Sequence, residues 1–200
     1  MGSFSSILVV IDPTVSEQPA LGKVLQIASS SRAGVELLLC DTRARYEERL
    51  LQKAPLSSEV IDRSLRHWLE SLATPLRNAG IEVTTAIIRG ESLHTTIQEW
   101  LGNSPADLVV KDTHHHSLVR RTFLSNTEWH LIRGCPRPLL LTKPTRWRHP
   151  PCVGAAIDPV HPHDPSASLD RAIMAASTTL AHALESRVQV FNSYYPAMLA

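Results

Sequence analysis

Cysteine, aromatic residues and long apolar runs are all scarce in this chain of 200 residues. The three cysteines, Cys40, Cys135 and Cys152, lie far apart and form no CxxC pair, so the sequence indicates neither a disulfide framework nor a cysteine metal site. This usage is typical of a reducing cytoplasm, where we expect the protein to act. The apolar runs are strand-sized, about five residues, whereas a membrane-spanning helix needs roughly 20. We therefore expect no membrane partner.

An excess of charge of one sign is also missing. The formal net charge is +1, which gives no electrostatic preference for nucleic acid or for an anionic membrane. The first residues, MGSFSSILVVIDP, lack the basic start and the long apolar core of a secretory signal. The composition, 43% hydrophobic and 20% charged, is that of an ordinary globular protein. These values predict one domain with a good core, with at most part of a second, and no nucleic-acid partner.

Short apolar runs alternate with helical stripes along most of the chain. We expect strands at Ser6–Asp12, Val35–Asp41, Ile81–Ile88, Asp107–Lys111 and Pro138–Lys143. Helical spacing recurs between these runs, and the stripe from Ile61 to Leu76 is expected to kink or end at Pro75. Another helix, expected near residues 126–133, starts with a capping-box pattern of Ser125 and Glu128. Such alternation predicts a parallel sheet with helices on both faces.

The end of the chain repeats its beginning. The stretch PTRWRHPP carries three prolines in eight residues and is predicted to be a stiff linker. After it, VGAAIDP echoes ILVVIDP, and RVQVFNSY parallels GVELLLCDT. We therefore predict a first domain at residues 1–143, a linker at 144–151 and an incomplete second copy at 152–200.

These repeated runs, together with ADLVVKDTHHHSLVRRTFLSNTEWHLIRGCPRPLLLTK, resemble the universal stress protein family and in particular its tandem-domain, E-type members. The resemblance covers nearly the whole chain. It implies a Rossmann-like α/β fold, similar to that of the adenine-nucleotide α-hydrolases. Its open five-stranded parallel sheet has the order 3-2-1-4-5, with helices on both faces, and a partial strand–helix–strand copy follows. In a sheet of this order, ligands bind beyond the carboxyl ends of strands 1 and 4.

The loop after strand 4 lacks glycine throughout. Nucleotide-binding members of the family carry Gly-x2-Gly-x9-Gly-(Ser/Thr) there, because glycine lets the backbone approach phosphate groups. The matching positions in this chain are Asp112, His115, Ser125 and Asn126. We therefore expect a stress-response protein that is not an enzyme: a ligand-sensing or partner-binding module with no catalytic residues and no required cofactor. One alternative is an ATP-binding switch with at most slow hydrolysis, and another is a module that binds an acidic lipid or a nucleotide sugar.

The expected ligand is small and phosphorylated or acidic. The candidate ligand-binding residues are Asp12, Asp112, His115, Arg120, Arg121, Ser125 and Asn126. Asp12 matches the aspartate that family members use near adenine and ribose, but a carboxylate at this position equally suits capping of the following turn. Arg120 and Arg121, with Lys111 upstream, form either an anion patch or ordinary solvated surface charge.

Three consecutive histidines, residues 114–116, lie in the loop after the fourth strand. Successive side chains of an extended segment point apart and do not converge on one ion, so we expect no metal site there. Trp129 and His130 are expected to be packing residues of their helix.

Tandem members of the family pair their two domains through their fifth strands. The exposed apolar edge at Pro138–Thr142 therefore predicts a homodimer in which two copies of this strand meet.

Overall fold

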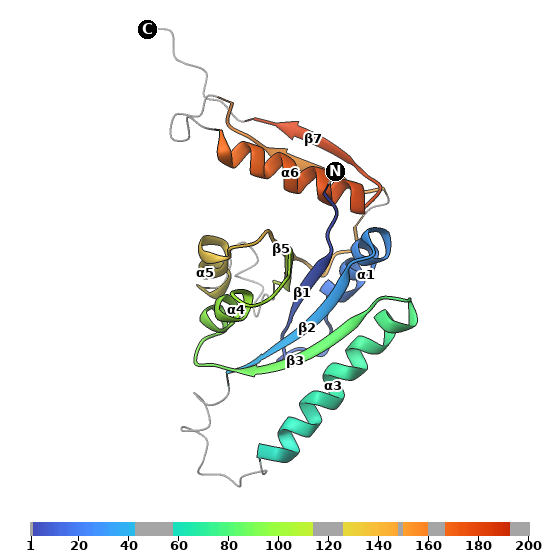
Figure 1. The fold of residues 1–200 in the computed structure, drawn as a ribbon, viewed down its shortest axis with the longest axis vertical. Helices are drawn as coiled ribbons and strands as arrows, with labels where there is room; N and C mark the ends of the chain where they lie inside the picture. Colours follow the sequence, from blue (N-terminus) through green and yellow to red (C-terminus); the bar gives the residue numbers. More distant parts are fainter. Residues whose placement is uncertain (1, 43–57, 114–125, 148–149, 160–166, 193–200) are drawn as a thin grey trace. The chain divides into compact units, whose positions relative to one another are not determined.

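The computed structural model describes residues 2–42, 58–113, 126–147, 150–159 and 167–192 of the chain (Figure 1). These residues belong to two compact units. One unit is formed by Phe4–Thr145, and the other by Met1–Ser3 with Arg146–Ala200. The first unit contains a five-stranded parallel sheet, and the second contains a two-stranded parallel sheet.

The five-stranded sheet has the order β3-β2-β1-β4-β5, which confirms the predicted fold class. Its strands are β1 (Ser6–Ile11), β2 (Gly34–Asp41), β3 (Val83–Arg89), β4 (Leu108–Asp112) and β5 (Leu139–Thr142). Every residue of β4 is buried, and so is every residue of β1 after Ser6. Central strands of a sheet covered on both faces have no solvent-facing side. Their amino-acid sequences are therefore mainly apolar.

In the described part of the chain, α1 and α3 cover one face of the sheet and α4 and α5 cover the other (Figure 1). Their bounds are Pro19–Ser31 for α1, Ser58–Asn78 for α3, Leu93–Leu101 for α4 and Asn126–Gly134 for α5. Below α4 and α5, a core cluster joins Leu38 and Val109 of the sheet to Ile97 and Leu131 of the helices. Helix α3 continues three residues beyond Pro75, so the proline lies within its last turns and does not end it.

The second unit repeats the start of the first with β6 (Cys152–Ala156), α6 (Ser168–Ala183) and β7 (Arg187–Phe191). Strands β6 and β7 pair in parallel. Among the residues described in this unit, the buried apolar side chains are three alanines, whereas Leu169 and Phe191 are 62% and 53% exposed. Alanine buries little apolar area, so this unit has only a small core.

Candidate functional site

Strands β1 and β4 lie side by side in the sheet, with Val10 opposite Lys111. The chain leaves both strands at the same edge. Asp12 follows the last residue of β1, and Asp112 is the last residue of β4. The two aspartates therefore stand at neighbouring strand ends, where an open parallel sheet of this order holds its ligands.

Asp112 turns its carboxylate inward, and its exposed fraction is only 3%. One oxygen, Oδ2, accepts a hydrogen bond of 2.9 Å from the backbone N–H of Ala20, and the other, Oδ1, accepts one from the hydroxyl of Thr142. Ala20 is the second residue of α1, and the first N–H groups of a helix have no partner within the helix. The carboxylate also faces the positive end of the helix dipole. Asp112 therefore caps α1 from a neighbouring strand.

Lys23 extends this network one turn further along α1. Its ammonium group donates a hydrogen bond to the backbone oxygen of Lys143, just after β5. Burial lowers the pKa of Lys23, and the attraction of Asp112 opposes that shift. The hydroxyl and the N–H of Thr113 both donate to the backbone oxygen of Thr142, at 2.9 and 2.8 Å. Hydrogen bonds and charge thus join α1, β4 and β5 at this edge of the sheet.

Lys111 forms a second buried pair, with Glu128 of α5. Its Nζ lies 3.5 Å from Oε1 of Glu128, and the two side chains are 8% and 3% exposed. The same Nζ donates a 2.8 Å hydrogen bond to the backbone oxygen of Asp112. The prediction that Lys111 belongs to a surface anion patch or to solvated charge is therefore wrong. A buried ammonium needs a charged partner, and Glu128 is turned toward the core to provide one.

Asp12 is half-buried and caps the turn that follows β1. Its Oδ1 accepts hydrogen bonds from the N–H and the hydroxyl of Thr14, at 2.8 and 2.6 Å. The side-chain amide of the buried Gln18 donates to the backbone oxygen of Asp12 at 2.7 Å. The contacts with Thr14 are those of an Asx turn. Capping of this turn was one of the two roles that the sequence allowed for Asp12, and ligand contact was the other. A direct role of Asp12 in binding stays a prediction.

The rest of the predicted loop cannot be placed in the same way. His115, Arg120, Arg121 and Ser125 lie outside the described residues, as does the histidine run at 114–116. Asn126 begins α5, and only its backbone is described. What the structure gives of this site is its framework, namely the end of β4, the start of α1 and the body of α5.

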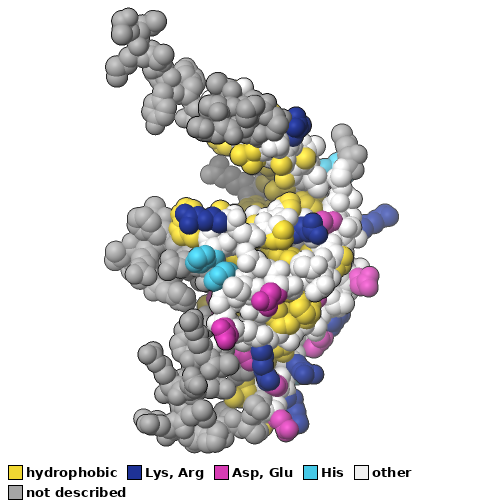
Figure 2. All heavy atoms as spheres, turned by 60° about the vertical axis from the view of Figure 1, so that its left-hand side comes forward, with side chains coloured by type: hydrophobic (Ala, Val, Ile, Leu, Met, Phe, Trp, Pro, Cys, Tyr) yellow, Lys and Arg dark blue, Asp and Glu magenta, His cyan; other side chains and the backbone are white. Residues whose placement is uncertain are grey.

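Two further residues of α5 depart from the sequence prediction. Trp129 is 46% exposed and lies 5.7 Å from the guanidinium of Arg133, and His130 is also exposed, so neither is a core packing residue. The ring of His130 stacks on that of His94, with centroids 4.4 Å apart and planes at 15°. Figure 2 shows histidine side chains lying next to one another on the left of the face that it draws. Planes that are nearly parallel do not converge on one ion, and in the described residues no group of three His, Cys, Asp or Glu side chains is placed to hold a metal.

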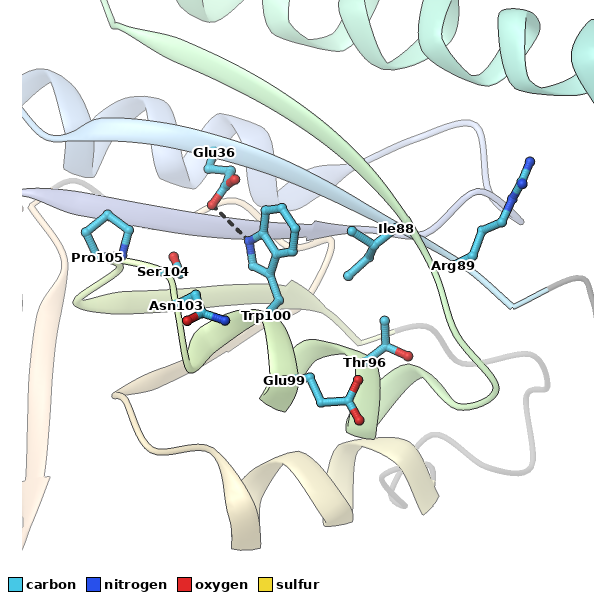
Figure 3. A pocket seen from close by; sticks show the side chains of 9 residues that line it. All are labelled: Glu36, Ile88, Arg89, Thr96, Glu99, Trp100, Asn103, Ser104 and Pro105. Carbon is cyan, nitrogen blue, oxygen red and sulfur yellow. Dashed lines mark hydrogen bonds between the residues drawn. The ribbon is translucent and has the colours of Figure 1, made fainter.

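Sequence reasoning missed a cavity of about 430 Å³ between α4 and strands β2 and β3 (Figure 3). The available signal was Glu36, a charged residue near the start of a strand whose next residues, Leu37–Cys40, are apolar. In the part of the chain that the structure describes, no helix is long and apolar enough to cross a membrane.

Comparison with known proteins finds curated relatives that are named universal stress protein E. Universal stress protein E of Escherichia coli K12 is 27% identical over 152 residues, which is 74% of this chain and 48% of that protein. A universal stress protein E homolog of Haemophilus influenzae is 26% identical over 163 residues, covering 78% of this chain and 52% of that protein. The chain therefore spans about half the length of the curated relatives it matches.

Solved structures share the fold. A functionally unknown protein from Pseudomonas aeruginosa PAO1 superposes with a TM-score of 0.71 at 27% identity, over 96% of this chain and 61% of that one. A universal stress protein in complex with cAMP superposes with a TM-score of 0.52 at 16% identity, over 72% of this chain and 100% of that one, and so shows the fold alone. The model of the universal stress protein family matches residues 3–143. That match spans more than half of the sequence and includes the whole five-stranded sheet, so the chain belongs to the universal stress protein family.

Proposed function

We propose that this stress-response protein is a non-enzymatic module that senses a ligand or binds a partner, with a loop that no longer binds a nucleotide triphosphate tightly. One observation carries the proposal. Asp112 stands where nucleotide-binding relatives are expected to have their first glycine, and its carboxylate is buried against the N-terminus of α1. The expected ligand site at the ends of β1 and β4, called the crevice below, therefore has an anionic side chain of the protein itself at its edge.

This placement opposes triphosphate binding in two ways. The carboxylate repels a polyphosphate, and that repulsion is strongest where water is excluded. The carboxylate also uses the Ala20 N–H, a helix N-terminal donor of the kind that anions normally bind. A ligand with a single phosphate or carboxylate group, held further out in the crevice, avoids both costs. We therefore favour a small phosphorylated or acidic ligand that carries less charge than ATP.

Isothermal titration calorimetry with ATP and magnesium tests this function. We expect no binding in the micromolar range, which corresponds to about −8 kcal/mol of binding free energy. Native mass spectrometry of the purified protein, searched for a co-purified anion, tests the positive half of the proposal. Micromolar ATP binding, with no other ligand retained, would refute it.

An adenine-nucleotide switch is the second candidate, and the position of Asp12 favours it. Asp12 directly follows β1 at the crevice, and a family member has been solved in complex with cAMP. If this chain binds a nucleotide through Asp12, Asp12→Ala abolishes the binding. Thr14→Val is the matched control, because it removes the hydroxyl that donates to Oδ1 in the same turn and leaves the carboxylate in place.

We also propose that the protein forms a homodimer through β5. This strand is the last of the described sheet on its side, and Leu139, Leu140 and Leu141 are only half-buried. An unpaired apolar edge associates with another strand unless it is covered. A second copy of the same edge would provide such a partner.

A further inference from the structure

The cavity beside α4 is separate from the crevice at the ends of β1 and β4. Its walls come from β2, the end of β3, α4 and the segment 103–105 that leads into β4 (Figure 3). Its volume of about 430 Å³ lies within the range of small-molecule sites. Neither Asp12 nor Asp112 lines it.

The cavity exists because α4 covers β2 more fully than β3. Side chains alternate along a strand, so Thr84, Ala86 and Ile88 share the face of β3 that looks toward α4. Thr84 is exposed, and Ala86 and Ile88 are only half-buried. The outer strand therefore leaves an apolar strip beside the helix, and Ile88 lines the cavity.

Trp100 of α4 forms the aromatic wall. Its indole N–H donates a 3.1 Å hydrogen bond to Oε2 of Glu36 on β2, and this contact fixes the orientation of the ring (Figure 3). The ring is half-buried and lines the cavity. A tryptophan face is the most favourable aromatic surface for a cation.

Two carboxylates also line the cavity. Glu36 and Glu99 lie on opposite sides of the Trp100 indole in Figure 3. Within the described residues, neither takes part in an ion pair. The cation at the rim is Arg89, and its charge is compensated by Asp41, at 3.8 Å, and by Asp62. The cavity thus has an apolar, aromatic middle and carries uncompensated negative charge on both sides of it.

We propose that this cavity binds a linear aliphatic diamine. One ammonium group pairs with Glu36 and the other with Glu99, and the methylene chain between them lies over the indole of Trp100 and the side chain of Ile88. Two cationic ends match the two carboxylates, and an alkyl chain matches the apolar middle. This ligand class goes beyond the proposed function, which concerns anions at the β1–β4 crevice.

Calorimetry with three compounds that share the same unbranched six-carbon chain tests the match. Hexamethylenediamine has two charges, hexylamine has one and hexanediol has none. We expect the dissociation constant to rise about three- to tenfold from the diamine to the monoamine, because the monoamine forms one ion pair fewer and a partly desolvated ion pair contributes more than an exposed one. Hexanediol should give no binding, and added sodium chloride should weaken diamine binding. Equal affinities for diamine and diol, or no diamine binding at all, would overturn the proposal.

Charge-neutral variants locate the two ends of the ligand. Glu36→Gln keeps an oxygen for the Trp100 N–H and removes the charge, whereas Glu99→Gln changes an exposed side chain. Each should weaken diamine binding at least about threefold. Glu82→Gln, at an exposed carboxylate that does not line the cavity, is the control and should have no effect.

Unchanged affinity in both cavity variants would overturn the assignment of the site. If Glu36→Gln fails to fold, the diamine affinity of Glu99→Gln alone tests the assignment of the site. Asp12→Ala should leave diamine binding unchanged, so failure of the crevice proposal and failure of the cavity proposal are distinguishable.

Discussion

The backbone N–H of Ala20 donates a 2.9 Å hydrogen bond to the carboxylate of Asp112, which lies 92 residues later in the chain. This contact ties the start of α1 to the end of β4, and the hydroxyl of Thr142 ties β5 to the same carboxylate. The crevice edge is therefore held together by a side chain of the protein itself.

Replacing Asp112 should lower the stability of the sheet unit. Asp112→Ala removes the acceptor of Ala20 and Thr142 and the nearby opposite charge of Lys23. We expect a loss of about 2–4 kcal/mol in the free energy of unfolding, measured by urea denaturation. Asp112→Asn, which keeps an acceptor oxygen, should lose about half as much. A loss below about 0.5 kcal/mol for Asp112→Ala would be typical of an ordinary surface residue and would contradict the capping role.

The buried pair of Lys111 and Glu128 should show coupling in a double-mutant cycle. Glu128→Gln leaves the buried ammonium of Lys111 without its ion-pair partner, which costs about 3–5 kcal/mol, and Lys111→Met removes the ammonium that lies beside the carboxylate of Glu128. The double variant leaves no charge, so its loss should be smaller than the sum of the single losses by more than about 1 kcal/mol. Denaturant unfolding of the four proteins measures this difference. Strict additivity would mean that the two side chains do not stabilise each other.

The five strands could be predicted because the buried parallel strands require short apolar runs, whereas the outer strand β3 shows the alternation of a half-buried strand. The role of Lys111 could not be predicted from the sequence. A lysine at the end of an apolar strand is usually a surface residue, and its partner Glu128 lies on a helix that approaches only in the folded chain. Glu128 itself matched a capping-box pattern, and tertiary pairing determined its orientation. The cavity beside Trp100 also depends on how far α4 extends across β3, which no local pattern encodes.

The three thiols should differ in reactivity. Cys152 is exposed and Cys135 is half-buried, whereas Cys40 is 4% exposed, and burial raises its pKa to about 12. Because the thiolate is the reactive form, iodoacetamide should modify Cys152 first, Cys135 next and Cys40 only on unfolding. Timed alkylation followed by mass spectrometry measures the order. Early labelling of Cys40 would contradict its burial.

Cys40 should also make stability depend on alkaline pH. Its folded-state pKa of about 12 lies above the ordinary value of 9.0, so the unfolded chain releases this proton more readily. The contribution to stability is therefore complete below pH 9.0 and is lost as the pH rises toward about 12. Cys40→Ala is the control, because its unfolding free energy should lack this part of the decline.

The strand–helix–strand unit should exchange its amide hydrogens faster than the sheet unit. Its two strands each have one paired neighbour in the described residues, and its buried apolar side chains there are alanines. Few buried contacts permit frequent local opening. Hydrogen exchange followed by mass spectrometry should show β6 and β7 exchanging well before β1 and β4. Slow exchange of β6 and β7 in a monomer would show that this unit is stable by itself.

The predicted dimer should depend on the edge of β5. Light scattering at micromolar concentration should give about twice the monomer mass, and Leu140→Lys should shift the protein to monomer, because an edge-strand lysine opposes strand pairing. Val60→Lys is the matched control, since Val60 is a 49% exposed apolar residue on α3, which packs on β3 at the other end of the sheet. It should leave the dimer intact. Circular dichroism checks that both variants fold. A wild-type protein that is monomeric at these concentrations, or a dimer that Val60→Lys disrupts as strongly as Leu140→Lys, would contradict assembly through β5.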